Sequence, residues 1–529
     1  MSTRTQDRMP PVSTVPALVD RAARLSHGDG IVLPGERVGF AQFAELTRTM
    51  ARRLRAAGIE HGDRVGLLTT DRIESLAMLF GAMRMGAVPV PVNARYKARE
   101  LSYVVENAGM RALLLDPSFA PLLDDASLPA SCRVVVGLDE PAFVAAGDSV
   151  DDAELDRLES AVQPDDSAII LYTSGTTASP KGCVYVHRGM ATQAFSYGSA
   201  LELTADDRFW SPLPLFHVAG LVTLLACIAA PCPLVHVGHH FEPGPALDQL
   251  EHERCTLAFP AFETIWLAVQ NEPRFAEADL GSLRLVIAVG SPGSLRLMQE
   301  RLPSVIQVSS FGSTECGGFV SIGRATDPVE VRLTTNGRAF PGSELRIVDP
   351  ETGDDLPPNT PGEILMRGPT RFVRYHEEPE LTAEVIDEDG WFHSGDLGRM
   401  DEEGRLSFAG RLKDMLKVGG ENVAAAEIET YLLGHPACEI VQVVAAPDAR
   451  YTEVAAAFVQ LAPGATATEQ ELIDYCRGQI ATFKVPRYVR FVDEWPMSGT
   501  KIQKFELRER IAAELAAAGI TEAPRITSG

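Results

Sequence analysis

The sequence predicts an α/β protein with a large N-terminal domain of parallel-type βαβ sheets plus a small antiparallel barrel-like sheet, and a small mobile α+β C-terminal domain. Up to about residue 330, short apolar runs alternate with longer amphipathic segments, as in strands joined by crossover helices. Short strands between Pro/Gly turns then indicate an antiparallel sheet or barrel. The rest is long enough for a separate domain, so domains are predicted over 1–410 and 411–529.

Helix and strand signals alternate over residues 15–160. Residues 40–57 carry apolar side chains at helical spacing, and Gly58 ends this segment. The acidic segment 148–159 is predicted to be a solvated linker helix. Further helices are expected over 74–85 and 101–108, and strands over 64–68, 87–91, 112–115 and 133–136.

Two later strands run directly into polar turns that contain glycine. Residues 283–289 precede Gly290-Ser291-Pro292-Gly293, and residues 305–310 precede Phe311-Gly312-Ser313-Thr314-Glu315. Turns just past strand ends are where ligands of α/β sheets bind. Other strands are expected over 167–171, 255–259, 344–348, 362–366, 405–408, 440–445 and 454–460, and tail helices over 469–480 and 505–517.

Composition and charge narrow the range of functions. An apolar fraction of 45% with 23% charged residues is typical of a soluble globular protein. The net charge of −24 argues against nucleic acid or an anionic membrane as the principal partner, although a local basic cluster can still bind phosphate. Eight cysteines without C-x-x-C or zinc-ligand spacing favour core thiols in a reducing compartment.

No segment predicts stable membrane insertion. The N-terminus is polar and lacks the apolar core of a signal peptide. Residues 218–237 are almost wholly apolar, but Gly220, Pro231 and Pro233 interrupt them, so a buried helix followed by a strand is expected. The sequence therefore predicts a cytoplasmic protein, and a homodimer is compatible with it.

The segment 172–182, Y-T-S-G-T-T-A-S-P-K-G, follows a short buried strand. Gly175 allows neighbouring N–H groups to converge on an anion, and Lys181 adds a mobile positive charge suited to phosphate. The P-loop pattern G-x-x-x-x-G-K-[ST] does not fit, because Pro180 precedes the lysine and Gly182 follows it. On composition alone, a polar surface turn and a phosphate site are equally good interpretations.

Four ordered motifs resemble the adenylate-forming superfamily: the loop at 172–182, Phe311-Gly312-Ser313-Thr314-Glu315, His393-Ser394-Gly395-Asp396 and Gly410-Arg411-Leu412-Lys413-Asp414. This superfamily includes acyl-CoA synthetases, 4-coumarate–CoA ligase-like enzymes, firefly luciferase and peptide-synthetase adenylation domains. The resemblance runs from about Leu46 to Leu507 and is nearest in kind to acyl-CoA synthetases. It implies that a small-molecule carboxylic acid and ATP react, with Mg²⁺, to give an acyl-adenylate and pyrophosphate. The acyl group then passes to coenzyme A.

The resemblance also implies roles for individual residues. Glu315 would bind Mg²⁺, with Thr314 beside it in the same catalytic motif, and one carboxylate with phosphate oxygens and waters is a normal magnesium shell. Asp396 would accept hydrogen bonds from the ribose hydroxyls, with Arg411 assisting, and Phe311 would stack on the adenine. The β- and γ-phosphates would be held by Thr173, Ser174, Gly175, Thr176, Thr177 and Lys181, and the adenine slot would be formed by Gly290, Ser291, Pro292, Phe311 and Gly312.

The C-terminal domain would carry the second half of the mechanism. By resemblance, Lys501 would approach the α-phosphate and the carboxylate during adenylation. Lys413 occupies the hinge position about which the small domain would swing, and Gly419 and Gly420 would leave room for the pantetheine arm of coenzyme A. The two departures from the family pattern are Ala178 and Thr500, which stand where glycine is usual.

The acyl pocket is expected around His217, which resembles the family segment Phe216–Gly220. We expect His217 to line the pocket rather than to act as a general base. Phe262 and Trp266 would add apolar walls, and no charged residue in these segments indicates an amino or dicarboxylic acid. Fatty, alicyclic and aryl acids all fit such a pocket.

Three functions compete at this point. The leading one is an AMP-forming acyl-CoA ligase, and its alternative is a stand-alone acyl-adenylating enzyme that loads a carrier protein in trans. The third is a nucleotide-binding protein without catalysis. Five retained residues oppose the third: Lys181, Glu315, Asp396, Arg411 and Lys501.

Overall fold

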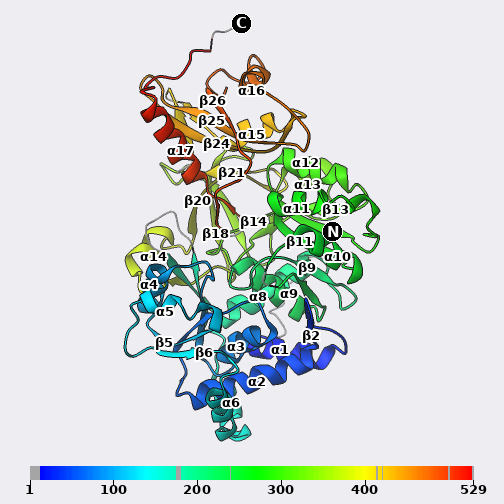
Figure 1. The fold of residues 1–529 in the computed structure, drawn as a ribbon, viewed down its shortest axis with the longest axis vertical. Coiled ribbons are helices and arrows are strands. Elements are labelled where there is room, and N and C mark those ends of the chain that lie inside the picture. Colours follow the sequence, from blue (N-terminus) through cyan, green and yellow to red (C-terminus); the bar gives the residue numbers. More distant parts are fainter. Residues whose placement is uncertain are drawn as a thin grey trace.

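The structure, a computed structural model, describes residues 12–173, 180–238, 240–412, 415–419, 421–498 and 501–526, and gives Val136, Asn422, Ser498 and Lys501 by their backbone alone. The molecule is elongated (Figure 1). The N-terminal helices lie at one end of it and the part that follows residue 415 lies at the other. The predicted fold class is confirmed, because parallel and antiparallel sheets both occur in a mixed α/β chain.

The N-terminal sheet is parallel throughout, with the order β4-β3-β5-β6. Helices α2 and α3 pack against each other through the rings of Phe43 and Phe80, whose centroids are 5.5 Å apart. The strands are β3 (Arg64–Leu68), β4 (Val88–Pro91), β5 (Met110–Leu115) and β6 (Arg133–Val136). The surrounding helices are α1 (Val15–Leu25), α2 (Phe40–Ala56), α3 (Ile73–Arg84), α4 (Ala98–Ala108) and α5 (Leu122–Asp125).

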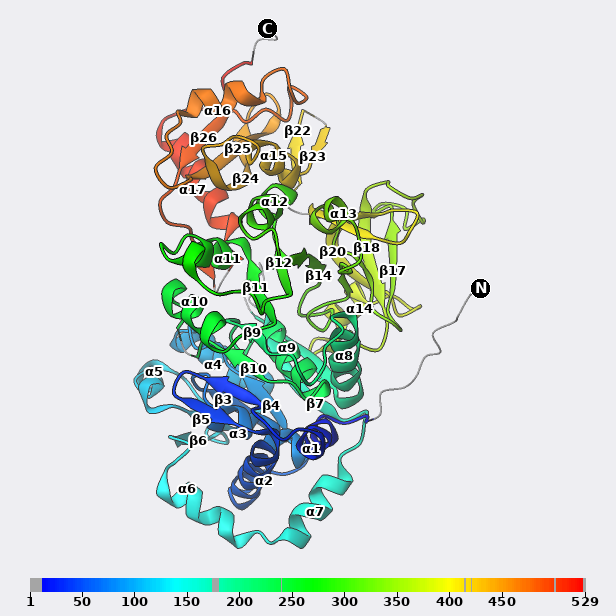
Figure 2. The same ribbon diagram turned by 90° about the vertical axis from the view of Figure 1, so that its right-hand side faces the viewer.

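Two helices, α6 (Pro141–Ala146) and α7 (Asp152–Ala161), cross the N-terminal end of the molecule (Figure 2). The predicted helix is present as α7 and is largely exposed, and arginines of α2 pair with acidic residues along one side of it. Arg48 donates to Glu159 at 2.8 Å, and Arg55 donates to Glu154 at 2.7 Å.

The largest sheet has the order β13-β12-β11-β9-β10-β1-β2 and is parallel except for the hairpin of β1 and β2. Its strands are β1 (Ile31–Leu33), β2 (Glu36–Val38), β9 (Phe209–Ser211), β10 (Leu234–His236), β11 (Leu257–Phe262), β12 (Leu285–Val289) and β13 (Ile306–Val308). The helices packed on it are α8 (His187–Ala200), α9 (Val218–Ala229), α10 (Pro243–His252), α11 (Glu263–Gln270) and α12 (Pro292–Arg301).

The apolar segment 218–237 forms helix α9 and strand β10, as predicted. Helix α9 is buried on nearly all sides because it fills the core beside the large sheet. Among the residues that the structure describes, no helix has the length and apolarity needed to cross a bilayer.

A small three-stranded sheet, with the order β19-β8-β7, lies between the parallel sheets. It is antiparallel and consists of β7 (Ser167–Thr173), β8 (Lys181–Val186) and β19 (Arg374–Tyr375). The predicted phosphate loop therefore connects two antiparallel strands, and Thr173 pairs directly with Lys181 at its base.

The antiparallel region after residue 309 is built from two sheets, with the orders β14-β15-β16 and β17-β18-β20-β21. The first contains β14 (Ser310–Phe311), β15 (Ser321–Ile322) and β16 (Arg338–Ala339). The second contains β17 (Glu344–Val348), β18 (Gly362–Arg367), β20 (Phe392–Met400) and β21 (Leu406–Arg411), and the nearby helices are α13 (Val329–Thr334) and α14 (Pro379–Val385).

The C-terminal part has a sheet of the order β23-β22-β25-β24, with β26 parallel to β25, and apolar cores on both of its faces. A short hairpin of β27 and β28 precedes the last helix. The strands are β22 (Leu416–Val418), β23 (Glu421–Val423), β24 (Cys438–Asp448), β25 (Thr452–Leu461), β26 (Tyr488–Phe491), β27 (Met497–Ser498) and β28 (Lys501–Ile502). The helices are α15 (Ala425–Leu432), α16 (Glu469–Cys476) and α17 (Lys504–Ala517). The boundary between residues 410 and 411 stays a prediction.

Candidate active site

The three-stranded sheet brings the base of the predicted phosphate loop to a buried aromatic ring. Lys181 begins β8, and its Nζ lies 5.4 Å from the ring centroid of Tyr375 on the neighbouring strand. A lysine at this distance from an aromatic face is attracted by the ring quadrupole. The loop residues Ser174, Gly175, Thr176, Thr177 and Ala178 lie outside the described residues.

The turn that carries Thr314 and Glu315 is fastened to the same sheet. The hydroxyl of Tyr185 on β8 donates to the carbonyl of Thr314 and accepts the N–H of Gly317 at 3.1 Å. The N–H of Phe372 donates to the carbonyl of Glu315 at 2.9 Å. Burial raises the pKa of Tyr185, so its hydroxyl keeps the proton that it donates.

The carboxylate of Glu315 meets the same ring that faces Lys181. The hydroxyl of Tyr375 donates to Glu315 Oε1 at 3.0 Å, and burial with the nearby Glu315 charge raises the pKa of this tyrosine. The structure therefore brings Lys181 and Glu315 together around Tyr375, which the sequence analysis did not single out.

The Glu315 site fits a magnesium ion that shares its ligands with a phosphate. Within the described ranges, no group of three or more His, Cys, Asp and Glu side chains could hold a metal ion unaided. Mg²⁺ is commonly held by one or two carboxylates, with phosphate oxygens and waters completing an octahedron. A single ordered carboxylate near a lysine matches that donor set.

Asp396 and Arg411 pair across strands β20 and β21. Arg411 Nε lies 3.5 Å from Asp396 Oδ1, and the aspartate is buried. The residues of β20 just before Asp396 are held by Glu363 on β18, which accepts the N–H of Gly395 at 3.0 Å and contacts His393 Nδ1 at 3.1 Å. The two predicted ribose-binding residues thus form one ordered corner.

The predicted adenine slot is built from close backbone approaches. Ser291 caps α12 by accepting the N–H of Ser294 at 3.1 Å, and Pro292 occupies the first turn. A Cβ at Gly312 would lie 2.2 Å from the carbonyl oxygen of Gly318, so only glycine fits there. The ring of Phe311 stacks on Phe408 at 5.5 Å, which covers one of its faces.

His217 lies at the N-terminus of α9 beside the ring of Phe216, with centroids 4.6 Å apart. Burial and the positive charge of Arg95 lower the pKa of His217 to about 4. The imidazole is then neutral and weakly basic at neutral pH, which supports a pocket-lining role over general-base catalysis.

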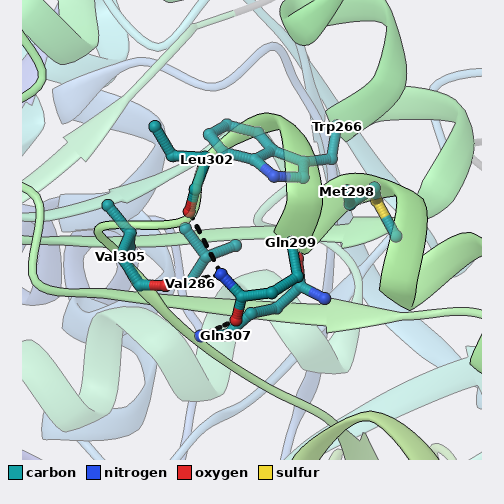
Figure 3. Close-up of a pocket in the computed structure, with 7 residues that line it drawn as sticks. All are labelled: Trp266, Val286, Met298, Gln299, Leu302, Val305 and Gln307. Atoms are coloured by element: carbon teal, nitrogen blue, oxygen red, sulfur yellow. Dashed lines mark hydrogen bonds between the residues drawn. The ribbon is translucent and has the colours of Figure 1, made fainter. Parts of the chain in front are cut away.

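The aromatic residues Phe262 and Trp266 belong to different clusters. Phe262 packs on the cluster that contains α9, whereas Trp266 lies under α12 near Met298 (Figure 3). The space beside Trp266 is too small for a water molecule, and hydrogen bonds from Gln299 to the carbonyls of Leu302 and Val305 close it. Trp266 therefore has a core environment, where the sequence suggested a pocket wall.

The same segment contains a charged residue that the sequence analysis overlooked. Glu263 begins α11, and its Oε2 has no hydrogen-bond partner among the described residues and no exposed surface. A Cβ at Gly290 would lie 2.8 Å from this oxygen, so the carboxyl group lies directly beside the predicted adenine turn. The sequence signal that could have identified Glu263 is a charged residue at the start of an apolar helical segment.

The C-terminal residues divide between two places. Trp495 precedes the hairpin that carries Lys501 and Ile502 belongs to it, and both pack on the cluster of α11 and α12 as well as on the C-terminal core. Gly419, with φ of 61°, forms the turn between β22 and β23, well separated from β7 in Figure 2. The side chain of Lys501 and the residues Lys413, Gly420 and Thr500 lie outside the described part.

Comparison with known proteins identifies the class. Residues 18–376 match the AMP-binding enzyme family, and residues 427–501 match the AMP-binding enzyme C-terminal domain. The chain belongs to the AMP-binding enzyme family. It is 35% identical to the putative acyl-CoA synthetase YngI of Bacillus subtilis, with 94% of this chain and 97% of that protein covered. It is 34% identical to a feruloyl-CoA synthase of an Amycolatopsis species, with 93% and 97% covered.

Solved structures agree. The anthranilate CoA ligase AuaEII in complex with anthranoyl-AMP has a TM-score of 0.86 at 26% identity, covering 98% of this chain and all of that one (100%). ATP-bound MatB of Rhodopseudomonas palustris has a TM-score of 0.83 at 28% identity, and its apo form has 0.75, with 94% and 99% covered in both.

The particular activity follows from this family and from relatives of that kind. The chain is an AMP-forming acid–thiol ligase that uses ATP, Mg²⁺ and coenzyme A. The predicted superfamily, enzyme class and co-substrates are confirmed, and the carrier-loading alternative is not favoured. The individual residue roles stay predictions.

Proposed function

We propose that this enzyme converts an apolar carboxylic acid into its coenzyme A thioester through an acyl-adenylate. Relatives of this chain are named for feruloyl-CoA, for long-chain fatty acids and for an alicyclic propanoyl group. The apolar surroundings of α9 and the neutral His217 support the same range of acids here. The observation that carries the proposal is the cluster of Lys181, Tyr375 and Glu315 at the base of the loop.

The chemistry explains why such a cluster is needed. A thiol cannot displace oxide from a carboxylate, so the acid must first acquire AMP as a leaving group. That step brings two anions together and places further charge on the departing pyrophosphate. Lys181 and the loop residues Thr173–Thr177 would hold the β- and γ-phosphates, and Glu315 with Thr314 would hold Mg²⁺ beside them. The metal ion, when bound, neutralises phosphate charge.

The nucleoside would lie between two ordered parts of the molecule. Asp396, with Arg411 in register beside it, would accept hydrogen bonds from the ribose hydroxyls. The turn Gly290-Ser291-Pro292 and the pair Phe311-Gly312 would bound the adenine, with the face of Phe311 away from Phe408 turned to the base. The adenine set sits at the ends of β12 and β14, where α/β sheets bind ligands.

We assign the two half-reactions to two poses of residues 411–529. Lys501 would neutralise charge at the α-phosphate in the first pose. A swing about Lys413 would then withdraw it and bring Gly419 and Gly420 to the pantetheine channel. The higher TM-score with ATP-bound MatB than with apo MatB supports the first pose for this structure.

We also propose that the enzyme works in the cytoplasm. The eight cysteines are free and buried, which supports a reducing compartment. We keep a homodimer as a proposal, which light scattering tests by comparing the particle mass in solution with the chain mass of 57.1 kDa.

Pyrophosphate exchange tests the proposal most directly. We expect exchange that depends on an added acid and on Mg²⁺ but needs no thiol, followed by thioester formation when coenzyme A is added. A panel of fatty, alicyclic and aryl acids then identifies the substrate class. If a carrier protein is acylated and coenzyme A is not, the alternative function is correct.

A further inference from the structure

Tyr375 occupies a two-residue strand whose position is fixed by backbone pairing. It lies opposite Cys183 on β8, and directly opposed residues of an antiparallel pair project to the same face of the sheet. Lys181 and Tyr185 each lie two residues from Cys183 along β8, so their side chains share that face. The face therefore presents Lys181, Tyr185 and Tyr375 to the turn that carries Glu315.

The hydroxyl of Tyr375 has a fixed direction of donation. It donates to Glu315 Oε1 at 3.0 Å, and a carboxylate can only accept. A hydrogen bond to a charged group restricts the carboxylate rotamer, because other rotamers would break the bond.

The ring of Tyr375 is itself held in place. Phe372 is fully buried and its ring lies 4.7 Å from that of Tyr375, tilted by 54°. The backbone N–H of Phe372 also binds the carbonyl of Glu315 at 2.9 Å. The segment 372–375 therefore contacts Glu315 through both the backbone and a side chain, while the Tyr375 ring faces Lys181 Nζ at 5.4 Å.

We infer that Tyr375 is a positioning residue for adenylation, whose hydroxyl orients the Glu315 carboxylate toward Mg²⁺ and whose ring orients the Lys181 ammonium toward the phosphates of ATP. This inference rests on the proposed roles of Glu315 and Lys181. The two functions use different atoms of one side chain, so they are separable: phenylalanine removes the first and keeps the second, and alanine removes both.

The test compares Tyr375→Phe and Tyr375→Ala with Glu315→Gln. For each, the Mg²⁺ concentration for half-maximal pyrophosphate exchange is measured, together with ATP binding by calorimetry with and without Mg²⁺. Tyr375→Phe should raise the half-saturating Mg²⁺ concentration about tenfold and leave metal-free ATP binding unchanged. Tyr375→Ala should in addition weaken metal-free ATP binding about threefold.

A matched control is Tyr431→Phe, which removes a tyrosine hydroxyl that donates to the carbonyl of Tyr475 at 3.3 Å in the C-terminal part. It should leave both quantities at the wild-type value. Melting temperatures of all variants separate positioning from simple stability.

The outcomes distinguish the inference from the function on which it rests. If Glu315→Gln raises the Mg²⁺ requirement and Tyr375→Phe does not, the inference is overturned and the proposed function stands. If Tyr375→Phe lowers only the melting temperature, the role is structural and the inference is again overturned. If Glu315→Gln leaves the Mg²⁺ requirement unchanged, the assignment of Glu315 itself fails.

Discussion

Charged side chains are held in different ways in two regions of this molecule. On the face of the three-stranded sheet, Lys181 and Glu315 are arranged around one buried aromatic ring. Where the C-terminal part meets α11 and α12, acidic groups are instead paired with basic or amide groups, or are left unpaired. The first arrangement leaves the charges of Lys181 and Glu315 available to a ligand. In the second region, most charges are instead neutralised by partners within the protein.

The second region, which we call the interdomain contact, is defined by Asn271, Arg301, Glu439, Gly293 and Leu433. Asn271 Nδ2 donates to Glu439 Oε1 at 3.0 Å, and Arg301 lies 3.6 Å from the same carboxylate, whose side chain is only 3% exposed. A Cβ at Gly293 would lie 2.8 Å from Cβ of Leu433, so the two surfaces approach closely.

An ion pair with a buried carboxylate lies beside this contact. Lys504 Nζ donates to Glu429 Oε1 at 2.5 Å, and the N–H of Val443 donates to the same oxygen at 2.7 Å. Both charges act on Glu263 across the contact, and burial raises the pKa of Glu263 to about 7. The comparison therefore contrasts a preorganised ligand site with a contact whose carboxylates already have protein partners, Glu439 across the contact and Glu429 within the C-terminal part.

The largest expected effect concerns Lys501, on the hairpin strand that precedes α17. Lys501→Ala should lower acid-dependent pyrophosphate exchange by about 10²–10³-fold, because it removes a cation from the charge that develops at the α-phosphate. Thioester formation from supplied acyl-AMP should be largely spared. Equal loss of both half-reactions would contradict the division into two poses.

The next effect concerns the buried partner of Lys504. Lys504→Met leaves Glu429, which is 8% exposed, without its cation and should cost roughly 3–5 kcal/mol of stability. The matched control is Lys484→Met, because the Lys484–Glu427 pair has the same 2.5 Å separation but a carboxylate that is 54% exposed. That control should cost under about 1 kcal/mol. Equal shifts in thermal unfolding would show that burial does not distinguish the two pairs.

Glu263 should make stability depend on pH in an identifiable window. Its folded pKa of about 7 lies above the ordinary glutamate value of 4.5, so between these two pH values the folded state holds a proton that the unfolded state has lost. Stability therefore falls as pH rises from about 4.5 to about 7, by roughly 3 kcal/mol in total. Glu263→Gln should remove this slope and melt higher than the wild type at pH ~8.

Its control is Glu384→Gln, at an exposed position of α14. That variant should follow the wild type at both ends of the window. A Glu263→Gln variant with the wild-type slope would mean that this carboxyl is ionised in the folded protein.

The smallest effect concerns the amide of the interdomain contact. Asn271→Ala removes one hydrogen bond to the buried Glu439 and should cost about 1–2 kcal/mol, since Arg301 remains nearby. Gln470→Ala removes an exposed hydrogen bond from the Gln470 side-chain amide to Asp474, also 3.0 Å long, and should leave stability nearly unchanged. Differential scanning calorimetry measures the stability of both variants. If Asn271→Ala is as stable as the wild type, this hydrogen bond does not contribute to the stability of the contact.

Local patterns in the sequence predicted much of the architecture. Strand and helix periodicity identified the parallel sheets, and the interruption of 218–237 by Pro231 and Pro233 correctly gave a helix and a strand. The motifs around Lys181 and Glu315 were recognised because each is contiguous. That the two lie around one ring required long-range pairing.

The residues that were missed depend on such pairing. Tyr375 reaches Glu315 across 60 positions, and Tyr185 reaches Gly317 across 132 positions, through a strand of only two residues and a turn. Tyr375 has no periodic signal, since a two-residue strand shows no alternation, and the alternation of β8 does not say which distant turn Tyr185 contacts. Trp266 was misplaced for the opposite reason, because helical spacing alone does not say which of two clusters a side chain joins.

The hairpin beneath the phosphate loop has a consequence for how this enzyme can change. Because Thr173 and Lys181 are paired across β7 and β8, the ends of the loop are fixed by the sheet and not by the loop's own sequence. Replacements between them, such as Ala178 for glycine, or insertions of a few residues, should leave the lysine's attachment point where it is. We therefore expect the loop to be a favourable segment for engineering, with nucleotide affinity tuned there while the fold is kept.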